Sequence, residues 1–286
     1  IANVLLPTVV RLSFPNRVAL VTGAYTTILA ISASLAASIA VPSSNLLGGW
    51  NPALAIWILP MVMAIVLWLP QTRGQVTHVA QPAHAAAQEK RAVLRSPISW
   101  AIVGFFGIQS LGFYALLGWM PSALTSIGVT PTDAGNYLGF ASGIGIPTGL
   151  IISSMLGRFK SLAWWSAGTS MVTLSGNLLM TLVLVSQDTS WLILACVLIG
   201  LGMSATFPIS LSLISTRAST SAQTTQLSAM AQGWGYLVAA AGTFVVGYIA
   251  NLVGNWGASF VLLCSLTMVQ IAIGFYAGRP GLIPAK

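Results

Sequence analysis

The chain alternates long, uncharged apolar runs with shorter segments that hold its charges. A hydrocarbon core about 30 Å thick takes roughly 20 apolar helical residues to cross. The apolar stretch 1–10 is interpreted as the end of one span. Runs of sufficient length then predict eight complete membrane-spanning helices, near residues 18–42, 51–69, 98–120, 134–156, 162–185, 190–213, 227–250 and 257–277. These runs are too long and too uniformly apolar for barrel strands, which alternate in polarity over about 10 residues.

The cationic residues fall on one side of this predicted topology. If the spans alternate in direction, all eleven Lys and Arg residues lie in segments 11–17, 70–97, 157–161, 214–226 and 278–286. The opposite segments contain no cationic residue and hold Asp133 and Asp188. Because cytoplasmic loops carry the excess of Lys and Arg, this split supports both the span count and the orientation. We predict a multi-pass protein of the bacterial inner membrane with a cytoplasmic C-terminus.

Composition strengthens the membrane prediction. Of the 286 residues, 56% are hydrophobic and 5% are charged, whereas about 25% of the residues of a soluble domain are charged. The mean hydropathy is +0.88. The net charge of +8 does not indicate a nucleic-acid-binding surface, because the cationic residues are spread over several short loops. Cys196 and Cys264 both lie inside apolar runs, so we interpret them as packing residues rather than as a disulfide.

The longest charged segment, residues 70–97, is polar and rich in alanine, and we interpret it as a cytoplasmic linker between two halves. Its histidines, His78 and His84, are six residues apart and lack a third ligand nearby. Two histidines in such a stretch favour a plain linker over a metal site.

The segments on either side of the linker resemble each other. NVLLP at 3–7 and GGW at 48–50 flank one long span, and ATFP at 205–208 and GNW at 254–256 flank another in the same order. Parallel internal repeats are typical of membrane transporters. Six spans follow the linker and only two and a fraction precede it, so we predict an all-α transmembrane bundle that is truncated at its N-terminus. The predicted divisions are an N-terminal helical remnant over 1–69, the linker over 70–97 and a six-helix half over 98–286.

Two six-helix halves joined by a long cytoplasmic loop resemble the major facilitator superfamily. The stretches NVLLPTVVRLSFPNRVALVTGAYTT (3–27), GGWNPALAIW (48–57) and FGIQSLGFYALLGWMPSALTSIGV (106–129) are similar to its cyanate and nitroimidazole transporter branch. The third stretch is the most specific, since a span that carries Gln and Tyr and ends in Trp-Met-Pro is similar to the seventh helix of that branch. The resemblance implies that the fourth helix ends near Pro7 and Arg11 and that helices five to twelve follow. The first three helices, with the basic loop motif between helices two and three, are then expected to be missing.

By this resemblance, the expected function is secondary transport of a small polar or anionic solute, cyanate- or nitroimidazole-like, by alternating access through a central cavity. The alternative is a non-transporting membrane scaffold or an inactive truncated remnant of such a transporter. An enzyme is not expected, because no paired carboxylate, histidine cluster or Ser/His/Asp set lies at membrane depth. The expected partners are the solute, the lipid bilayer and an unidentified coupling ion, with no cofactor and no metal. No ionisable Asp, Glu, Lys, Arg or His lies within a complete span, so either a coupling ion binds in the missing helices or the intact protein is a uniporter.

Polar groups inside the spans are costly unless they pair or line a wet cavity, so they are the candidate solute-binding residues. Gln109 lies near the middle of its span, where its amide offers two donors and an acceptor to a small anion or a nitro group. Tyr114 is five residues later and about 140° around the helix, so the two cannot face one point without a local distortion. The alternatives are an interhelical hydrogen bond for Gln109 and an interfacial position for Tyr114.

Gln232 and Trp234, in the span near 227–250, are further candidates for solute binding. Asn177 ranks below them, because the resemblance places its helix at the periphery. Thr26 and Thr27 could line the cavity or bond back to their own helix, and we favour hydroxyls that bond back to the helix.

The stretch GFASGIGIPTG at 139–149 has the glycine density of a phosphate-binding loop, but no Lys-Ser or Lys-Thr follows it. It also lies inside an apolar span. Small residues four apart, Gly139 with Gly143 and Gly145 with Gly149, predict that this helix packs closely against neighbouring helices. Pro147 predicts a kink in it.

Overall fold

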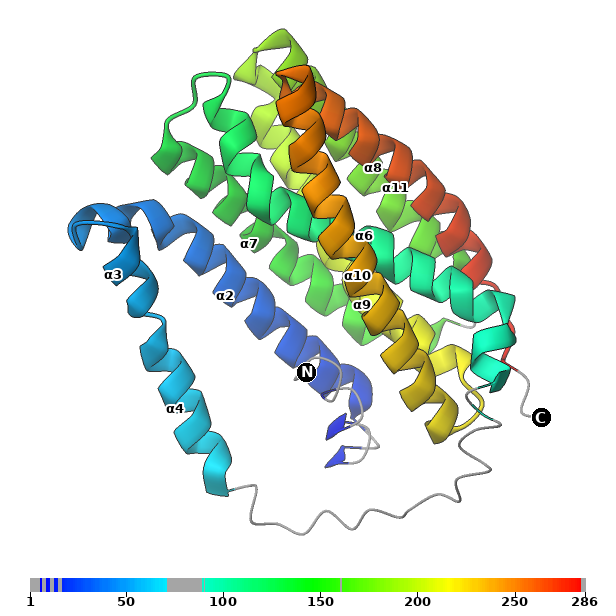
Figure 1. Ribbon diagram of the computed structural model, residues 1–286. Helices are drawn as coiled ribbons and strands as arrows, with labels where there is room; N and C mark the ends of the chain where they lie inside the picture. The colour runs from blue at the N-terminus through cyan, green and yellow to red at the C-terminus, as the bar shows by residue number, and fades with distance from the viewer. Residues whose placement is uncertain are drawn as a thin grey trace.

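The regular structure of the chain is helical throughout the described residues (Figure 1). The computed structural model describes residues 6, 9–10, 13–14, 17–70, 89, 91–159 and 161–283. Most of the predicted span end at 1–10, and the linker histidines His78 and His84, lie outside the described residues. The helices are α2 (Val18–Leu46), α3 (Trp50–Ala55), α4 (Ile58–Trp68), α6 (Pro97–Thr125), α7 (Pro131–Met155), α8 (Ala163–Ser186), α9 (Leu192–Arg217), α10 (Ser221–Val253) and α11 (Trp256–Ala277), with 3₁₀ turns η2 (Leu156–Arg158) and η3 (Thr189–Trp191).

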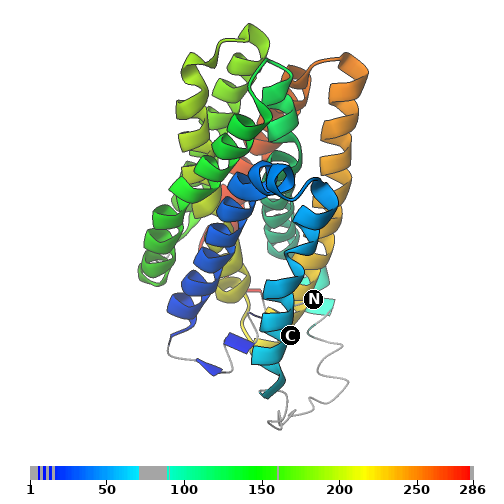
Figure 2. The same cartoon turned by 90° about the vertical axis from the view of Figure 1, so that its left-hand side faces the viewer.

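Eight helical segments of the described residues are long and apolar enough to cross a membrane, and they run side by side (Figure 2). The predicted all-α class and the eight spans are confirmed. Several helices extend beyond the predicted span ends. α2 continues through Pro42 to Leu46, and α6 continues through Pro121 to Thr125. Prolines are tolerated inside spanning helices where neighbouring groups satisfy the carbonyl that they leave free.

The span predicted at 51–69 is interrupted between α3 and α4. The break falls at Ile56 and Trp57, where the amides of Trp57 and Leu59 bond three residues back, to Leu54 and Ile56, at 3.2 Å each. Pro60 explains this position. A proline lacks the amide proton that would bond four residues back, and its ring collides with the carbonyl group there, which here belongs to Ile56.

Helices α6 to α11 form one bundle, in which α6 packs against α10 and α11, α8 against α9 and α11, and α7 against α9. Its buried apolar side chains form two clusters at different depths. One cluster includes Met120, Met180 and Phe260. The other includes Phe106 and Ile209. Each of these six helices contributes to one cluster near one end and to the other near its opposite end, and the buried polar side chains of Gln109, Asn177 and Gln270 lie between the two clusters.

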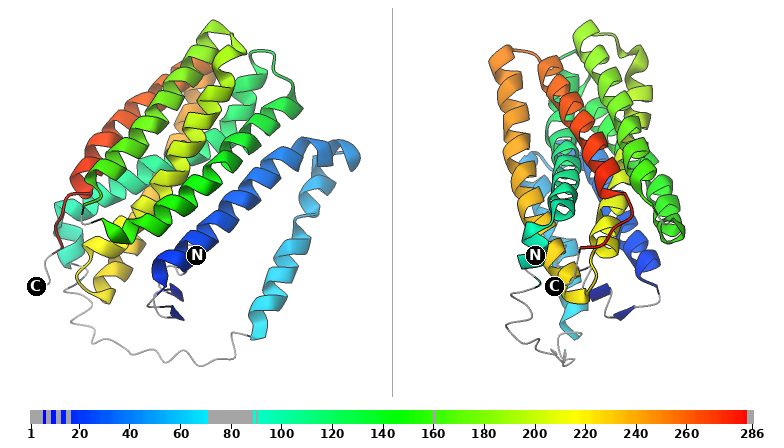
Figure 3. Two further views of the ribbon diagram at one scale, coloured as in Figure 1. Left: turned by 180° about the vertical axis from the view of Figure 1, so that it is seen from behind. Right: turned by 90° about the vertical axis from the view of Figure 1, so that its right-hand side faces the viewer.

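The N-terminal helices lie outside this bundle. α2 packs along α7, and Figures 1 and 3 show α2 lying between α7 and α4. α4 has no buried residue, and its apolar side chains are open, with Leu59 68% and Met63 64% exposed. A continuous apolar surface of this kind is stable only in apolar surroundings, as in the hydrocarbon core of a bilayer.

The glycines of α7 allow close approach on two faces, as predicted. Gly139 lies against Ser34 and Ser38 of α2, and Ser34 Oγ donates a 2.7 Å hydrogen bond to the Gly139 carbonyl. On the other face, Gly145 lies against Gly200 of α9, whose own neighbour across the interface is the backbone of α7. The stretch 139–149 is therefore a packing element inside a spanning helix, and the prediction of close packing is confirmed.

Charged side chains of the described residues are found at the helix ends. Arg217, which ends α9, is buried and donates hydrogen bonds from Nε to the Ala277 carbonyl at 3.2 Å and from Nη2 to the Gly278 carbonyl at 2.8 Å, so it caps α11. Between α8 and η3, at the opposite end of the bundle, hydrogen bonds from Ser190 hold the pKa of the Asp188 carboxyl below its ordinary value.

We predict that Gly200→Ala destabilises the bundle by about 1–3 kcal/mol, because the added Cβ would meet the carbonyl oxygen of Ala141 in the backbone of α7. Thermal unfolding in detergent measures this. The matched control is Gly168→Ala in α8, where no heavy atom lies within 4 Å of the new Cβ. Alanine is the better helix former, so the control should be neutral or up to about 1 kcal/mol more stable. Equal unfolding temperatures for the two variants would contradict the close contact of α7 with α9.

Candidate functional site

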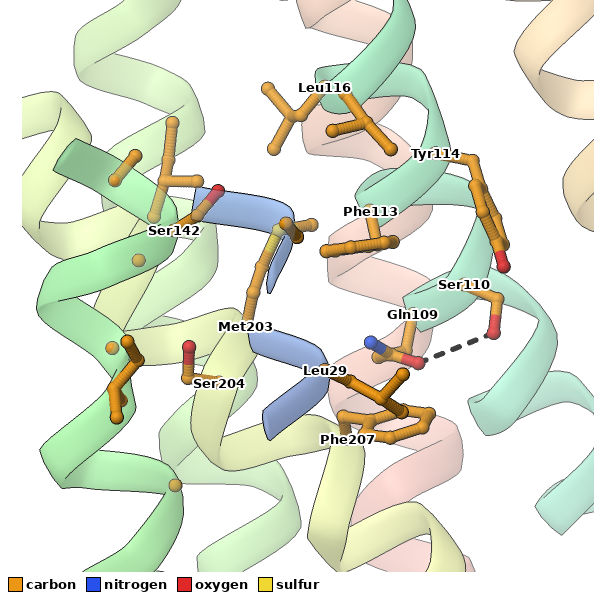
Figure 4. Close-up of a pocket in the computed structure, with 18 of the residues that line it drawn as sticks. Leu29, Gln109, Ser110, Phe113, Tyr114, Leu116, Ser142, Met203, Ser204 and Phe207 are labelled. Carbon is orange, nitrogen blue, oxygen red and sulfur yellow. Dashed lines mark hydrogen bonds between the residues drawn. The ribbon is translucent and has the colours of Figure 1, made fainter. Parts of the chain in front are cut away.

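A cavity of about 290 Å³ lies halfway along α6, between α2, α6, α7, α9 and α10 (Figure 4). Most of its lining is apolar. Among the described residues that line it, none carries a charged side chain. Its polar lining residues are Thr27, Gln109, Ser110, Tyr114, Ser142, Ser204 and Tyr236.

Gln109 is the one amide side chain among these lining residues, and it is only 4% exposed. Ser110 Oγ donates a long hydrogen bond of 3.4 Å to its Oε1. Figure 4 shows this oxygen turned toward Ser110 and the amide nitrogen turned into the cavity. Gln109 therefore presents a hydrogen-bond donor to whatever occupies the cavity.

Aromatic rings form the wall beside Gln109. Tyr114 is edge-on to Phe113 at 5.4 Å between ring centroids and to Tyr236 of α10 at 6.2 Å. Phe106, behind them, is edge-on to Tyr236 at 5.4 Å and tilted against Phe207 at 6.3 Å. Edge-to-face packing of this kind holds the rings in fixed positions. A flat apolar or aromatic molecule can therefore pack against a rigid surface here.

Small side chains on α7 and α9 form the opposite wall. Ser142 donates its hydroxyl proton to the Leu138 carbonyl at 2.9 Å, which leaves its oxygen as a hydrogen-bond acceptor. Gly145, Met203 and Ser204 lie below it in the same wall. Because these side chains are short or flexible, they leave the volume of the cavity open.

The structure brings Gln109 and Tyr114 to one cavity, although they are 140° apart on α6 by ideal helix geometry. The cavity is wide enough to be reached from both positions. Thr27 also lines the cavity, which is the less favoured of the two interpretations of this residue, whereas the side chain of Thr26 lies outside what is described.

Gln232 and Trp234 are not brought to this cavity. Gln232 is 1% exposed and donates from Nε2 to Ser228 Oγ at 2.9 Å, one turn before the cavity level. Trp234 is 50% exposed and lies beside Trp100 at 6.3 Å. The residue of α10 that lines the cavity is Tyr236, which is 200° around the helix from Trp234. The sequence offers no local signal for Tyr236, because only the packing of α10 decides which of its faces meets the cavity.

The Trp-Met-Pro end of the sequence stretch 106–129 has a packing role. Trp119 Nε1 donates a 2.8 Å hydrogen bond to the Thr243 carbonyl of α10, and its ring lies against Gly247 and 5.5 Å from Trp256. These contacts fix α6 against α10 and α11 on one side of the cavity.

Eight apolar spans in the described residues, five of which line a solute-sized cavity with polar groups, define a polytopic membrane protein of the transporter class. The protein-family model named Major Facilitator Superfamily matches residues 1–243 of the chain. The chain belongs to the major facilitator superfamily.

Curated relatives match almost the entire chain. The 2-nitroimidazole transporter of Escherichia coli (strain K12) is 33% identical over 279 residues, which are 98% of this chain and 69% of that protein. The uncharacterized transporter YycB of Bacillus subtilis (strain 168) is 29% identical, over 98% of this chain and 68% of that protein. The cyanate transport protein CynX of Escherichia coli (strain K12) is 24% identical, over 96% and 70%.

We predict that Ser204→Cys reacts readily with a small water-soluble thiol reagent, because Ser204 lines the cavity. The native cysteines give little background, since Cys196 is 0% and Cys264 4% exposed. Ser170→Cys is the matched control, at a serine of α8 that is 0% exposed and bonded to its own helix. Mass spectrometry after timed labelling measures both rates. Labelling of Ser204→Cys as slow as that of the control would mean that water does not reach this cavity.

Proposed function

We propose that this protein is a secondary transporter that carries a small, flat, polar and uncharged solute of the nitroimidazole class by alternating access. The observation that carries the proposal is a cavity with an aromatic wall, an inward-pointing amide donor on Gln109 and no charged lining residue among those described. The similarity to a protein named as a 2-nitroimidazole transporter supports the same solute class.

Each part of a nitroimidazole has a complementary group in the cavity. Its ring would pack against Tyr114 and Tyr236, where a flat molecule buries apolar area without distortion. Gln109 Nε2 would donate a hydrogen bond to a nitro oxygen. The Ser142 oxygen, whose proton is used within α7, would accept one from the ring N–H group.

The absence of a cationic side chain among the described lining residues favours a neutral solute over an anion such as cyanate. An anion that leaves water for an uncharged cavity loses its hydration without gaining a counter-charge. We therefore prefer a nitroimidazole-like solute, although a cyanate transport protein is also a relative.

Transport is favoured over the two other functions considered. The similarity to two proteins named as transporters of specific solutes extends over nearly the whole chain, which argues against a non-transporting scaffold. The described cavity lining offers one amide and several hydroxyls, with no carboxylate, histidine or cysteine to act as a catalytic base or nucleophile. This composition supports binding and release of a solute rather than its chemical conversion.

We also propose the bacterial inner membrane as the location, with the C-terminus in the cytoplasm. Arg158 ends the η2 turn after α7 and Arg217 ends α9, on the side where the positive-inside rule places the cytoplasm. Asp133, in the first turn of α7, lies at the other end of that span.

Sided labelling tests the orientation. Asp133→Cys should react with a membrane-impermeant maleimide added to intact cells, and Arg158→Cys should react only after the membrane is opened. Both positions lie at helix ends, so the reagent can reach them once it is on the correct side. Labelling of both cysteines in intact cells would reject the proposed orientation.

Reconstituted liposomes test the transport function. Protein-containing vesicles should take up labelled 2-nitroimidazole with saturable kinetics above the leak into protein-free vesicles, and cyanate should not compete. Competition by cyanate at similar concentrations would replace the proposed solute class with an anion. Uptake no faster than the leak, with correctly folded protein, would remove the transport proposal.

Gln109→Ala should weaken 2-nitroimidazole binding by about three- to tenfold, the usual net contribution of one hydrogen bond in a buried site. Calorimetric titration of the purified protein measures the affinity. Gln232→Ala is the matched control, because it removes a buried amide of α10 that bonds to Ser228 outside the cavity. The control should change affinity by less than about twofold. A larger loss from Gln232→Ala than from Gln109→Ala would move the site away from the cavity described.

A further inference from the structure

A second, much smaller chamber lies behind Gln109, inside the six-helix bundle. Its volume is about 10 Å³, and α6, α8, α9 and α11 all contribute to its walls. Gln109 and Met203 line both this chamber and the large cavity, so they form the partition between the two. The polar lining residues of the chamber are Gln109, Thr173, Asn177, Thr206, Thr267 and Gln270, each at most 4% exposed.

The chamber is rich in hydrogen-bond acceptors. The hydroxyls of Thr173, Thr206 and Thr267 each donate their proton to the carbonyl four residues earlier in their own helix, at 3.1, 2.6 and 2.7 Å. A hydroxyl has only one proton, so these oxygens have only lone pairs left for the chamber. A molecule that occupies the chamber must therefore donate hydrogen bonds.

Asn177 provides a further acceptor to the chamber, its side-chain oxygen. Its Nδ2 donates to Thr267 Oγ1 at 3.3 Å across the α8–α11 contact, and its Oδ1 is buried without a hydrogen-bond partner among the described residues. A buried amide oxygen without a partner is costly in an apolar interior. Although α8 is a peripheral helix, this side chain points inward to the layer that Gln109 occupies.

The size and charge of the chamber identify the occupant. About 10–15 Å³ of such space holds one water molecule. A metal ion or other cation would bring an unbalanced charge, because no carboxylate is found among the described residues that line the chamber. Water supplies two donors and two acceptors, and it satisfies the acceptors without adding charge.

We infer that the chamber binds one water molecule and that Asn177, through this water, is a positioning residue for Gln109. The water donates one hydrogen bond to Asn177 Oδ1 and the other to Gln109 Oε1, and it accepts from the amide of Gln270. Among the described residues, the long bond from Ser110 is otherwise the one hydrogen bond that holds the Gln109 oxygen. A water that holds Oε1 from the chamber side keeps Nε2 directed at the solute. In this step the inference rests on the proposed function.

A double-mutant cycle on 2-nitroimidazole binding tests this connection. Asn177→Val keeps the approximate shape but removes the amide, and it should weaken binding about fivefold, as expected for the loss of one positioned hydrogen bond. In a Gln109→Leu background, the same change should cost less than about twofold, because there is no longer an amide to position. Equal losses in both backgrounds would make Asn177 merely structural and overturn the inference.

Thr181→Val is the matched control for this cycle. Thr181 lies one turn after Asn177 on α8 and contacts Cys264 of α11 at 3.7 Å, but it does not line the chamber. It should leave the affinity for 2-nitroimidazole unchanged. A fivefold loss from this control would show that any disturbance of the α8–α11 contact weakens binding, and it would count against the specific role of Asn177.

A second measurement separates failure of this inference from failure of the proposed solute. An experimental structure at a resolution that shows ordered water should have a peak in the chamber, within hydrogen-bond distance of Asn177 Oδ1, which disappears in Asn177→Val. The unfolding temperatures of the two single variants and the double variant should be non-additive. If 2-nitroimidazole does not bind but both of these results are found, the water site in the chamber is supported and the proposed solute is rejected. Additive unfolding and no water peak overturn the chamber itself.

Discussion

A bilayer offers no hydrogen-bond partner to a polar group, and this constraint explains more of the molecule than any single contact. The chain meets it with long helices, whose backbone groups bond internally, and with serine and threonine hydroxyls that return their protons to their own helix. Ser142 and Thr206 both do this. The consequence for function is a mid-membrane layer with many acceptors and few donors. In that layer, the amide of Gln109 is a donor that the helix backbone does not use.

The two apolar clusters of the bundle determine where this layer lies along the helices. Cluster residues such as Met180 and Ile209 fill the space toward either end, and polar side chains lie between them. The large cavity and the small chamber open at the same level because both belong to this layer. Gln109 lines both, so the side chain that we propose to bind the solute also takes part in the internal packing of the bundle.

Span number, helix class and the packing role of the α7 glycines could be predicted from sequence, because length, charge and small-residue spacing are local properties. Gln109 could be found for the same reason, as an amide inside a long apolar run. Tyr236 could not be found in this way, because only the packing of α10 decides which face of that helix meets the cavity. Asn177 ranks low among the predicted residues because the family resemblance places its helix at the periphery, yet even a peripheral helix directs one face inward. The interruption at Ile56 follows from Pro60 and could have been read from the sequence.

The two faces of α7 share a feature that bears on how the molecule moves. On one face, the backbones of α7 and α9 approach closely at Gly145 and Gly200. On the other face, Cβ atoms added at Gly135 and Gly139 would meet backbone carbonyl oxygens of α2, and Ser34 donates a hydrogen bond to the Gly139 carbonyl. Backbone contact on both faces leaves α7 little freedom to slide, so a displacement of α7 is expected to carry α2 and α9 with it.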